Sequence, residues 1–365
     1  MDKLIERGIA IIRAGQAESG AYVACPAYPT YHYCWFRDGA FIASAMDRWG
    51  ESESARRFYQ WAAAAVTARQ AEVERCVAAA ARGEQPNPAD LLHTRYQLNG
   101  DQGADEWPNF QLDGFGTLLW AMSIHRMLHG AEGTSLWEPA ARLLVRYLAA
   151  LWERPNSDCW EEFSDRMAIS TLAALHGGLH AAADWLGDDQ AEGALARTTA
   201  RAVRALAFER GTFQGHLIKQ VDGDDVVDAS LLWAAVPFGE HGLLAAEHPL
   251  MQATAARVER DLIGGTGGVH RYRADTFYGG GEWMLLTALL GQYRLAIGDR
   301  EGANICRRYV ESHADPRGFL PEQVSTAALH PEWIAEWVER WGAVASPLLW
   351  SHAEYLRLAA LLLAP

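Results

Sequence analysis

Long segments with helical periodicity recur along the whole chain, and they restrict the fold more than any other feature. Five of the clearest are ESARRFYQWAAAAVTARQAEVERCVAAAA, FGTLLWAMSIHRMLHG, SLWEPAARLLVRYLAALWE, MAISTLAALHGGLHAAADWLG and SPLLWSHAEYLRLAALLL. In each, apolar residues return at the three- and four-residue spacing that places them on one helical face, and about a dozen such segments occur in all. The sequence therefore predicts an all-α protein, with strand-like alternation confined to YVACPAY and FQGHLIKQVDG.

The sequence predicts a single domain but leaves the arrangement of the helices open. Half of the 365 residues are hydrophobic and 21% are charged, which excludes extended disorder. No shift in composition and no Pro- or Ser-rich linker divides the chain, so we expect one domain over residues 1–365. Because no fixed short period is present, the pattern leaves a closed helical barrel, a helical solenoid and a large bundle open.

Charge and terminal composition exclude several classes of partner. The net charge is -14 and no run of Lys or Arg occurs, so neither a nucleic acid nor an anionic membrane surface is an expected partner. The first residues contain no uninterrupted apolar stretch of a secretory signal, and no stretch is long and apolar enough to span a membrane. Five widely spaced cysteines without a CxxC pair argue against a disulfide framework. We expect a cytoplasmic protein.

Two histidine pairs have the i, i+4 spacing of metal ligands, His125 with His129 and His176 with His180. Neither HRMLH nor HGGLH contains the glutamate of HExxH, and no third ligand is evident, so we expect ordinary surface or core histidines and no metal. The clusters GGTGG and GGG match no phosphate-binding loop. We therefore expect no cofactor.

The breaks between the helices are rich in aromatic, charged and glycine residues. Because a sugar packs its C–H face on an indole and its hydroxyls on charged groups, these breaks indicate a carbohydrate ligand. The relevant segments are YPTYHYCWFRDGAF, LNGDQGADEWPNFQLDGFG, NSDCWEEF, GGVHRYRADTFYGGGEW and DPRGFLPEQV.

Two of these segments carry candidate catalytic carboxylates. Glu161 and Glu162 in CWEEF could also be the acidic first turn of a helix that starts at about Ser164. Glu322 in GFLPEQV, if isolated, could be a solvated loop charge. Two carboxylates that face one site would allow glycoside hydrolysis, in which one protonates the leaving oxygen and the other deprotonates water.

Six motifs in fixed order resemble those of one known family. YHYCWFRDGAF, DEWPNFQLDGFG, DCWEEF, VHRYRADTFYGGGEW, GFLPEQV and SPLLWSHAEYL are similar to the successive motifs of the glucoamylase-type inverting glycoside hydrolases, from Tyr31 to Tyr355. The resemblance implies an (α/α)6 barrel of six outer and six inner helices, with the active-site pocket formed by loops at one end.

The resemblance also implies a role for each motif residue. Glu161 would be the general acid and Glu322 the general base, so Glu161 must carry a proton and Glu322 must be ionised, with help from the backbone and Gln323. Tyr31 would position the attacking water, Arg37 and Asp38 would bind the terminal glucose, and Glu162 would hold the sugar on the leaving side. The remaining implied substrate contacts are Trp107 at the pocket wall, Arg271 at the subsite boundary, and the aromatic positions Trp35, Trp160, Trp283 and Trp350.

Departures from the family pattern suggest a small substrate. The chain has no room for a β-sandwich or starch-binding module, and Glu282 stands where starch-cleaving members often carry proline, which could alter the leaving-side subsite. We expect exo-hydrolysis of α-1,6-linked isomaltose-type oligosaccharides with release of β-glucose. The alternatives are an α-1,4-glucan glucohydrolase, a trehalase, a phosphorolytic relative in which Arg317 is the nearest cation to the base, and a non-catalytic sugar-binding protein.

Overall fold

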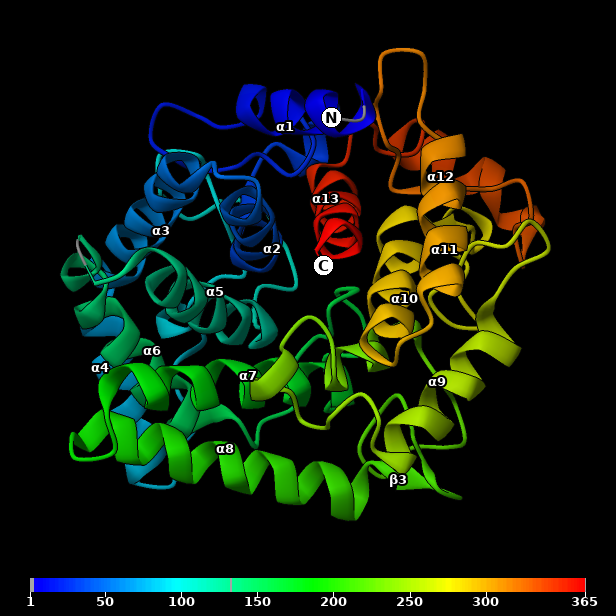
Figure 1. Cartoon of the computed structure of the whole chain (residues 1–365). Coiled ribbons are helices and arrows are strands. Elements are labelled where there is room, and N and C mark those ends of the chain that lie inside the picture. The colour runs from blue at the N-terminus through cyan, green and yellow to red at the C-terminus, as the bar shows by residue number, and fades with distance from the viewer. Residues whose placement is uncertain (1–2, 132, 365) are drawn as a thin grey trace.

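The helices form two concentric rings (Figure 1). The computed structural model describes residues 3–131 and 133–364. Outer and inner elements alternate along these residues, which is the arrangement of an (α/α)6 barrel. The outer ring comprises α1 (Lys3–Ala14), α3 (Ser52–Thr67), α6 (Glu138–Leu151), α8 (Ala191–Arg210), α9 (Pro249–Leu262) and α11 (Arg300–Ser312). The inner ring comprises α2 (Phe36–Arg48), α5 (Asp113–His129), α7 (Ile169–Leu186), η4 (Ala229–Ala234), α10 (Met284–Ala296) and α13 (Leu349–Leu363).

The fourth inner position differs from the expected helix, because η4 is a short 3-10 helix that packs against α7 and α10. Asp228 begins it, with a side-chain oxygen that accepts a 2.8 Å hydrogen bond from the backbone N–H of Ser230. Pro237, which lacks a backbone N–H, and Gly239, with φ of 59°, follow soon after and prevent a longer helix. The ring closes where α13 contacts α2.

The two rings differ in polarity because their burial differs. Helix α1 is amphipathic and buries Ile5, Ile9 and Ile12 on one face. The inner helices are covered on all sides, and α7 is apolar around most of its surface. Helices α5 and α7 cross so closely that a Cβ atom on Gly178 would lie 2.1 Å from the carbonyl oxygen of Gly116, so only glycine fits there.

Smaller elements complete the structure. Helix α4 (Gln70–Ala81) packs on α6, and α12 (Ile334–Trp341) lies between α11 and α13 in the sequence. Three antiparallel ribbons pair β1 (Cys34–Trp35) with β2 (Arg95–Tyr96), β3 (Thr212–Phe213) with β4 (His216–Leu217), and β5 (Glu282–Trp283) with β6 (Gln323–Val324). The β3–β4 ribbon overlaps the predicted FQGHLIKQVDG segment from Phe213 onward, whereas none of the strands among the described residues falls in the predicted YVACPAY segment.

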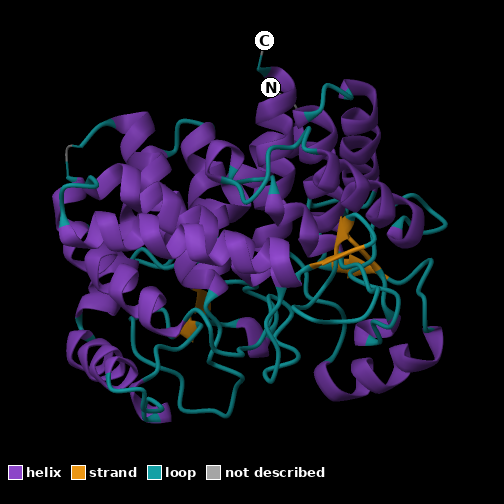
Figure 2. Cartoon of the chain, turned by 90° about the horizontal axis from the view of Figure 1, so that it is seen from below, coloured by secondary structure: helices purple, strands orange, loops and turns teal. Residues whose placement is uncertain are grey.

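The long loops gather at one end of the rings, opposite the end at which α13 finishes (Figure 2). The inner helices therefore begin at the loop end, where their unpaired N–H groups and positive dipole ends point toward the loops. Among the described residues, none of the helices combines the length and the apolar character that crossing a lipid bilayer requires.

Candidate active site

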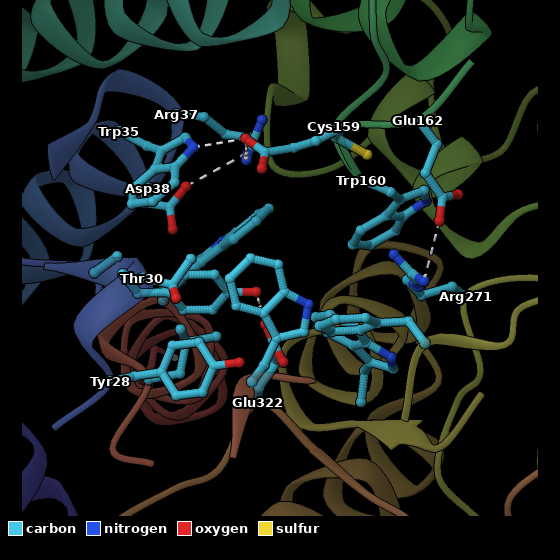
Figure 3. A pocket seen from close by; sticks show the side chains of 18 of the residues that line it. Tyr28, Thr30, Trp35, Arg37, Asp38, Cys159, Trp160, Glu162, Arg271 and Glu322 are labelled. Atoms are coloured by element: carbon cyan, nitrogen blue, oxygen red, sulfur yellow. Dashed lines mark hydrogen bonds and ion pairs between the residues drawn. The ribbon is translucent and has the colours of Figure 1, made fainter. Parts of the chain in front are cut away.

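A pocket of about 260 Å³ opens among the loops at the start of the inner helices. Figure 3 shows aromatic, acidic and arginine side chains converging on it from several elements. Every side chain that the sequence predicted for the site lines this pocket: Tyr31, Trp35, Arg37, Asp38, Trp107, Trp160, Glu161, Glu162, Arg271, Trp283, Glu322 and Trp350.

Glu161 lies in a tight turn. Its φ is 68° and that of Phe163 is 53°, a left-handed conformation that side chains rarely adopt and that functional sites often retain. Asp158 holds the turn, since one of its side-chain oxygens accepts hydrogen bonds from the backbone N–H groups of Trp160 at 3.0 Å and Glu162 at 3.1 Å. The predicted helix from about Ser164 is therefore wrong, because α7 begins only at Ile169.

Lys219, Asp158 and Asp228 form a buried charge cluster that supports this turn. The ammonium of Lys219 lies 2.6 Å from Asp228 and 3.4 Å from Asp158. Asp228 also accepts a 2.9 Å hydrogen bond from the indole Nε1 of Trp160. Burial raises the pKa of Asp158 to about 6, and the Lys219 charge opposes this rise. The cluster thus fixes both the backbone of the turn and the ring of Trp160.

One oxygen of Glu161 is fully occupied by protein donors. Trp35 Nε1 donates to Oε1 at 2.7 Å and Gln111 Nε2 donates to the same atom at 3.0 Å. The guanidinium of Arg37 lies 3.9 Å from this oxygen. These contacts leave the second oxygen, Oε2, as the atom of Glu161 that a ligand can use.

Glu322 lies on the opposite side of the pocket from Arg37 in the view of Figure 3. Tyr31 donates a 3.2 Å hydrogen bond to its Oε1, whereas Oε2 is buried and has no partner among the described residues. Burial raises the pKa of Glu322 to about 8. The pKa of Tyr31 is raised well above its usual value by burial and by the negative charges of Glu322 and Glu161.

Arg37 and Asp38 occupy the first turn of α2, beside one another. Arg37 donates to Asp113 at 3.2 Å and lies 3.4 Å from Asp38. Burial raises the pKa of Asp38 to about 7, although the Arg37 charge lowers it. Oδ2 of Asp38 is buried without a hydrogen-bond partner among the described residues, so an acceptor is available for a ligand hydroxyl.

Glu162 points to a different part of the pocket from Glu161. Its carboxylate accepts a hydrogen bond from the hydroxyl of Tyr272 and lies 3.5 Å from Arg271 (Figure 3). Arg271 is fixed by a two-point ion pair with Asp275, with Nε to Oδ2 at 2.7 Å. The guanidinium also lies 5.2 Å from the ring centre of Trp160, a cation–π distance.

The aromatic lining has a buried part and a more exposed part. Trp35 and Trp350 are buried and form the inner end of the pocket together with the start of α2. Trp107 packs edge-on against Trp35, with ring centres 6.0 Å apart, and is only partly buried. Trp337 and Trp341 of α12 are also partly buried, so these side chains lie toward the mouth.

Several residues of this site were not predicted from the sequence. Gln111 and Tyr272 stand inside motifs that were identified, NFQLDG and HRYRAD, but their contacts with Glu161 and Glu162 depend on the fold. Trp337 and Trp341 could have been found, because PEWIAEWVERW repeats tryptophan every four residues, a helical spacing.

Three expectations about neighbouring side chains are not supported by the geometry. Glu282 does not line the pocket, and its carboxylate instead accepts hydrogen bonds from Thr266 and from Tyr309 at 2.6 Å. The side chain of Gln323 bonds to backbone groups of Gly281 and Phe277 rather than to the carboxylate of Glu322. Arg317 is 69% exposed and pairs with Asp315, outside the pocket.

Comparison with known proteins identifies relatives over nearly the whole length. The profile of glycosyl hydrolases family 15 matches residues 5–308. An isomaltose glucohydrolase of Kribbella flavida is 42% identical over 361 residues, which are 98% of this chain and 92% of the relative. A trehalase of Mycolicibacterium smegmatis is 24% identical over 80% of this chain and 45% of its own length.

Solved structures agree with the fold. A glycosidase variant in complex with glucose is 41% identical, with a TM-score of 0.94 over 99% of this chain and 96% of the other. A bacterial glucoamylase complexed with acarbose is 21% identical, with a TM-score of 0.76 over 98% of this chain and 55% of the other. A glucoamylase of Saccharomycopsis fibuligera is 14% identical, with a TM-score of 0.72 over 98% of this chain and 94% of the other. The more distant structures share the helical double ring.

Proposed function

Because the chain belongs to glycosyl hydrolases family 15, we propose that this glycoside hydrolase is inverting and exo-acting, and that it releases β-glucose from the non-reducing end of short α-1,6-linked glucosides. The observation that supports it most is the pairing of Glu161 and Glu322, which line the same pocket and each have one carboxylate oxygen held by protein hydrogen-bond donors. The 42% identity to an isomaltose glucohydrolase supports isomaltose as the first substrate to test.

The two carboxylates divide the chemistry between them. Glu161, protonated on Oε2, donates its proton to the glycosidic oxygen, and the resulting carboxylate is stabilised by the N–H groups of Trp35 and Gln111. Glu322, ionised, removes a proton from a water bound at Oε2, while Tyr31 holds Oε1 and orients the carboxylate. Attack of this water on the face opposite the leaving group inverts the anomeric configuration.

The other pocket residues orient the sugar. Arg37 and Asp38, at the buried end of the pocket, bind the hydroxyls of the terminal glucose. Glu162 and Arg271 contact the leaving-side sugar. A pocket with a closed, buried end accepts only a chain terminus, which favours exo action. The indole rings supply stacking surfaces for the sugar faces: Trp35, Trp107, Trp160, Trp283 and Trp350.

A proton NMR time course with isomaltose tests the proposal directly. Early appearance of β-glucose, before mutarotation, is the expected result, and Glu161→Gln as a matched control should give none. Early α-glucose would exclude inversion. If isomaltose is not cleaved, parallel tubes with maltose, nigerose and trehalose identify the linkage, and no cleavage of any would favour the non-catalytic alternative. The phosphorolytic alternative predicts that inorganic phosphate accelerates sugar release.

Two further properties belong to the same proposal. We expect residues 1–365 to act as a single catalytic domain, since α1 packs against α13 and joins the two ends of the described chain. We also expect a cytoplasmic location, because all five cysteines are buried free thiols, a state that a reducing compartment maintains. We expect small oligosaccharides as substrates and glucose as the product, which agrees with a single catalytic domain in the cytoplasm.

A further inference from the structure

Three side chains with metal-ligand chemistry meet at the end of the inner ring opposite the pocket. Asp47 is in the last turn of α2, while His125 and His129 are in the last two turns of α5. Asp47 Oδ1 lies 2.8 Å from His125 Nδ1 and 3.2 Å from His129 Nε2. The three candidate ligand atoms all lie within 4.8 Å of one another. The sequence showed only the two histidines, and the fold adds the third ligand from another helix.

We propose that Asp47, His125 and His129 bind one divalent transition-metal ion of the zinc class, which clips the end of α2 to the end of α5. This site is separate from the active site, since Asp47 is roughly 14 Å along the axis of α2 from Asp38 at 1.5 Å per residue. Its role is to stabilise the helical ring.

The distances suit such an ion with small adjustments. Zinc bonds to nitrogen and oxygen are about 2.0–2.2 Å long, so two ligands of a tetrahedral ion stand about 3.4 Å apart. The distances of 2.8 and 3.2 Å from Asp47 are shorter by a few tenths of an ångström, as hydrogen bonds between the same atoms require. A histidine binds a metal through a ring nitrogen that carries no proton, and moving the N–H proton to the other ring nitrogen frees the nitrogen that faces Asp47.

Two of the three side chains are buried, which orders the site, and the third is partly exposed, which leaves a route for an ion. The side chains of Asp47 and His125 are 1% and 5% exposed, and His129 is 33% exposed. The rings of Tyr59 and Trp137 pack at 5.2 and 5.3 Å from the ring centre of His125 and shield it from water. An ion can therefore enter beside His129 and complete its coordination with water on that side.

The types of ligand select the class of ion. Calcium and magnesium prefer sets of oxygen ligands, whereas this site offers a single carboxylate beside two imidazole rings. Imidazole nitrogen binds zinc and copper through more covalent bonds, which favours this ion class.

The other histidine pair provides a matched control. His180 stands near His241, with ring centres 5.2 Å apart, and His241 binds Asp184 at 3.0 Å. The Asp184 carboxylate is also paired with Arg197 at 2.6 Å. Like the proposed site, this histidine pair has helical spacing and a nearby carboxylate, but among the described residues no three candidate ligand atoms come together there.

Calorimetric titration of the chelator-treated full chain with zinc chloride tests the proposal. We expect one equivalent to bind with micromolar or tighter affinity, and the melting temperature to rise with zinc because the ion binds only the folded chain. His129→Ala, at a partly exposed position, should fold normally but lose both effects, whereas His180→Ala should retain both. Cobalt(II) should give the visible absorption of a tetrahedral site in the unsubstituted chain but not in His129→Ala.

Three results would overturn the proposal. The first is the absence of zinc binding to the unsubstituted chain, and the second is equal zinc affinity in His129→Ala. The third is binding that disappears in His180→Ala but persists in His129→Ala, which would place the ion elsewhere. Hydrolysis by His129→Ala should equal that of the unsubstituted chain, since the pocket is at the other end of the helices.

Discussion

The indole Nε1 of Trp35 donates a hydrogen bond of 2.7 Å to Oε1 of Glu161, which lies 126 positions further along the chain. This bond matters most when Glu161 has given up its proton, because a donor stabilises the carboxylate more than the acid. The pair therefore links the start of α2 to the catalytic turn, and this link is stronger in the transition state than in the ground state.

Trp35→Phe should therefore lower kcat more than it raises KM. Since a hydrogen bond to a charged group contributes about 1.5–3 kcal/mol, the expected loss is about 10- to 100-fold. Steady-state kinetics with isomaltose measure it. Trp107→Phe is the matched control, because the indole N–H of Trp107 has no hydrogen-bond partner among the described residues. Equal losses of kcat in the two variants would contradict a role for the Trp35 bond.

The adjacent glutamates should respond differently to the same substitution. Glu161→Gln removes the proton donor and should lower kcat by about 100- to 10,000-fold, while the affinity for isomaltose is kept. Glu162→Gln weakens the contacts with Arg271 and Tyr272 at the leaving side and should mainly raise KM. Calorimetric binding and initial rates separate the two effects. Near-normal turnover by Glu161→Gln would remove it as the general acid.

The folded state should lose stability as the pH rises, because Glu322 then becomes ionised while it is buried. Its pKa is raised by burial from 4.5 to about 8, so its ionisation is disfavoured in the folded chain above the unfolded pKa. The contribution of neutral Glu322 to the free energy of unfolding is fully present below about pH 4.5. It is lost as the pH rises toward 8, at about 1.4 kcal/mol per pH unit. The same carboxylate must be ionised to act as a base, so kcat/KM should rise over this interval.

Glu322→Gln separates these two consequences. Thermal unfolding should show no gain in Tm for the variant at about pH 4, where both side chains are neutral, and a gain that grows toward pH 8. Its activity should be lower by about 100-fold or more at every pH. A difference in Tm that does not change with pH would mean that Glu322 is not held in its neutral form by burial.

Local motifs made much of this site predictable. WFRDGAF carries Trp35, Arg37 and Asp38 into the pocket together, because they are neighbours in the chain and stand at the start of one helix. Relationships between distant segments were not predictable. No spacing in the sequence indicates that Gln111 holds Glu161, since this contact depends on where two loops meet.

The expected fold is confirmed, and two local expectations differ from the structure. Helical periodicity placed the inner helices, but the stretch around η4 is apolar enough to pass for one of them and is shortened by Pro237. The acidic pair Glu161 and Glu162 looked like a first helical turn because acidic residues favour that position. The Asp158 side chain instead holds these residues in a turn that ends before the helix.

Trp341 at the pocket mouth should affect the disaccharide but not its product. Glucose alone can occupy the inner end near Arg37, whereas the second sugar of isomaltose must lie nearer the mouth. Trp341→Ala should raise KM for isomaltose about 2- to 10-fold, a typical aromatic contribution, and leave inhibition by glucose unchanged. Trp333→Ala, at a position that is 40% exposed and outside the pocket, is the control. Weaker glucose inhibition in Trp341→Ala would place this ring at the inner subsite.

Lys219 tests whether the buried charge cluster positions the catalytic turn. Lys219→Met leaves Asp228 and Asp158 buried without their cation, which typically costs about 3–5 kcal/mol. Because Asp158 holds the backbone N–H groups of the turn and Asp228 holds the ring of Trp160, kcat should fall at temperatures at which the variant is still folded.

The double variant Lys219→Met with Asp228→Asn distinguishes charge from packing. If Lys219→Met loses stability because a buried carboxylate is left unpaired, removing that charge as well should restore part of the Tm. The effects of the two substitutions on stability should then not be additive. Recovery of Tm without recovery of kcat would show that the Trp160 contact with Asp228 positions the turn independently of stability. A Lys219→Met variant with unchanged Tm and kcat would contradict the positioning role, because the turn at Glu161, with φ of 68°, would then hold without its support.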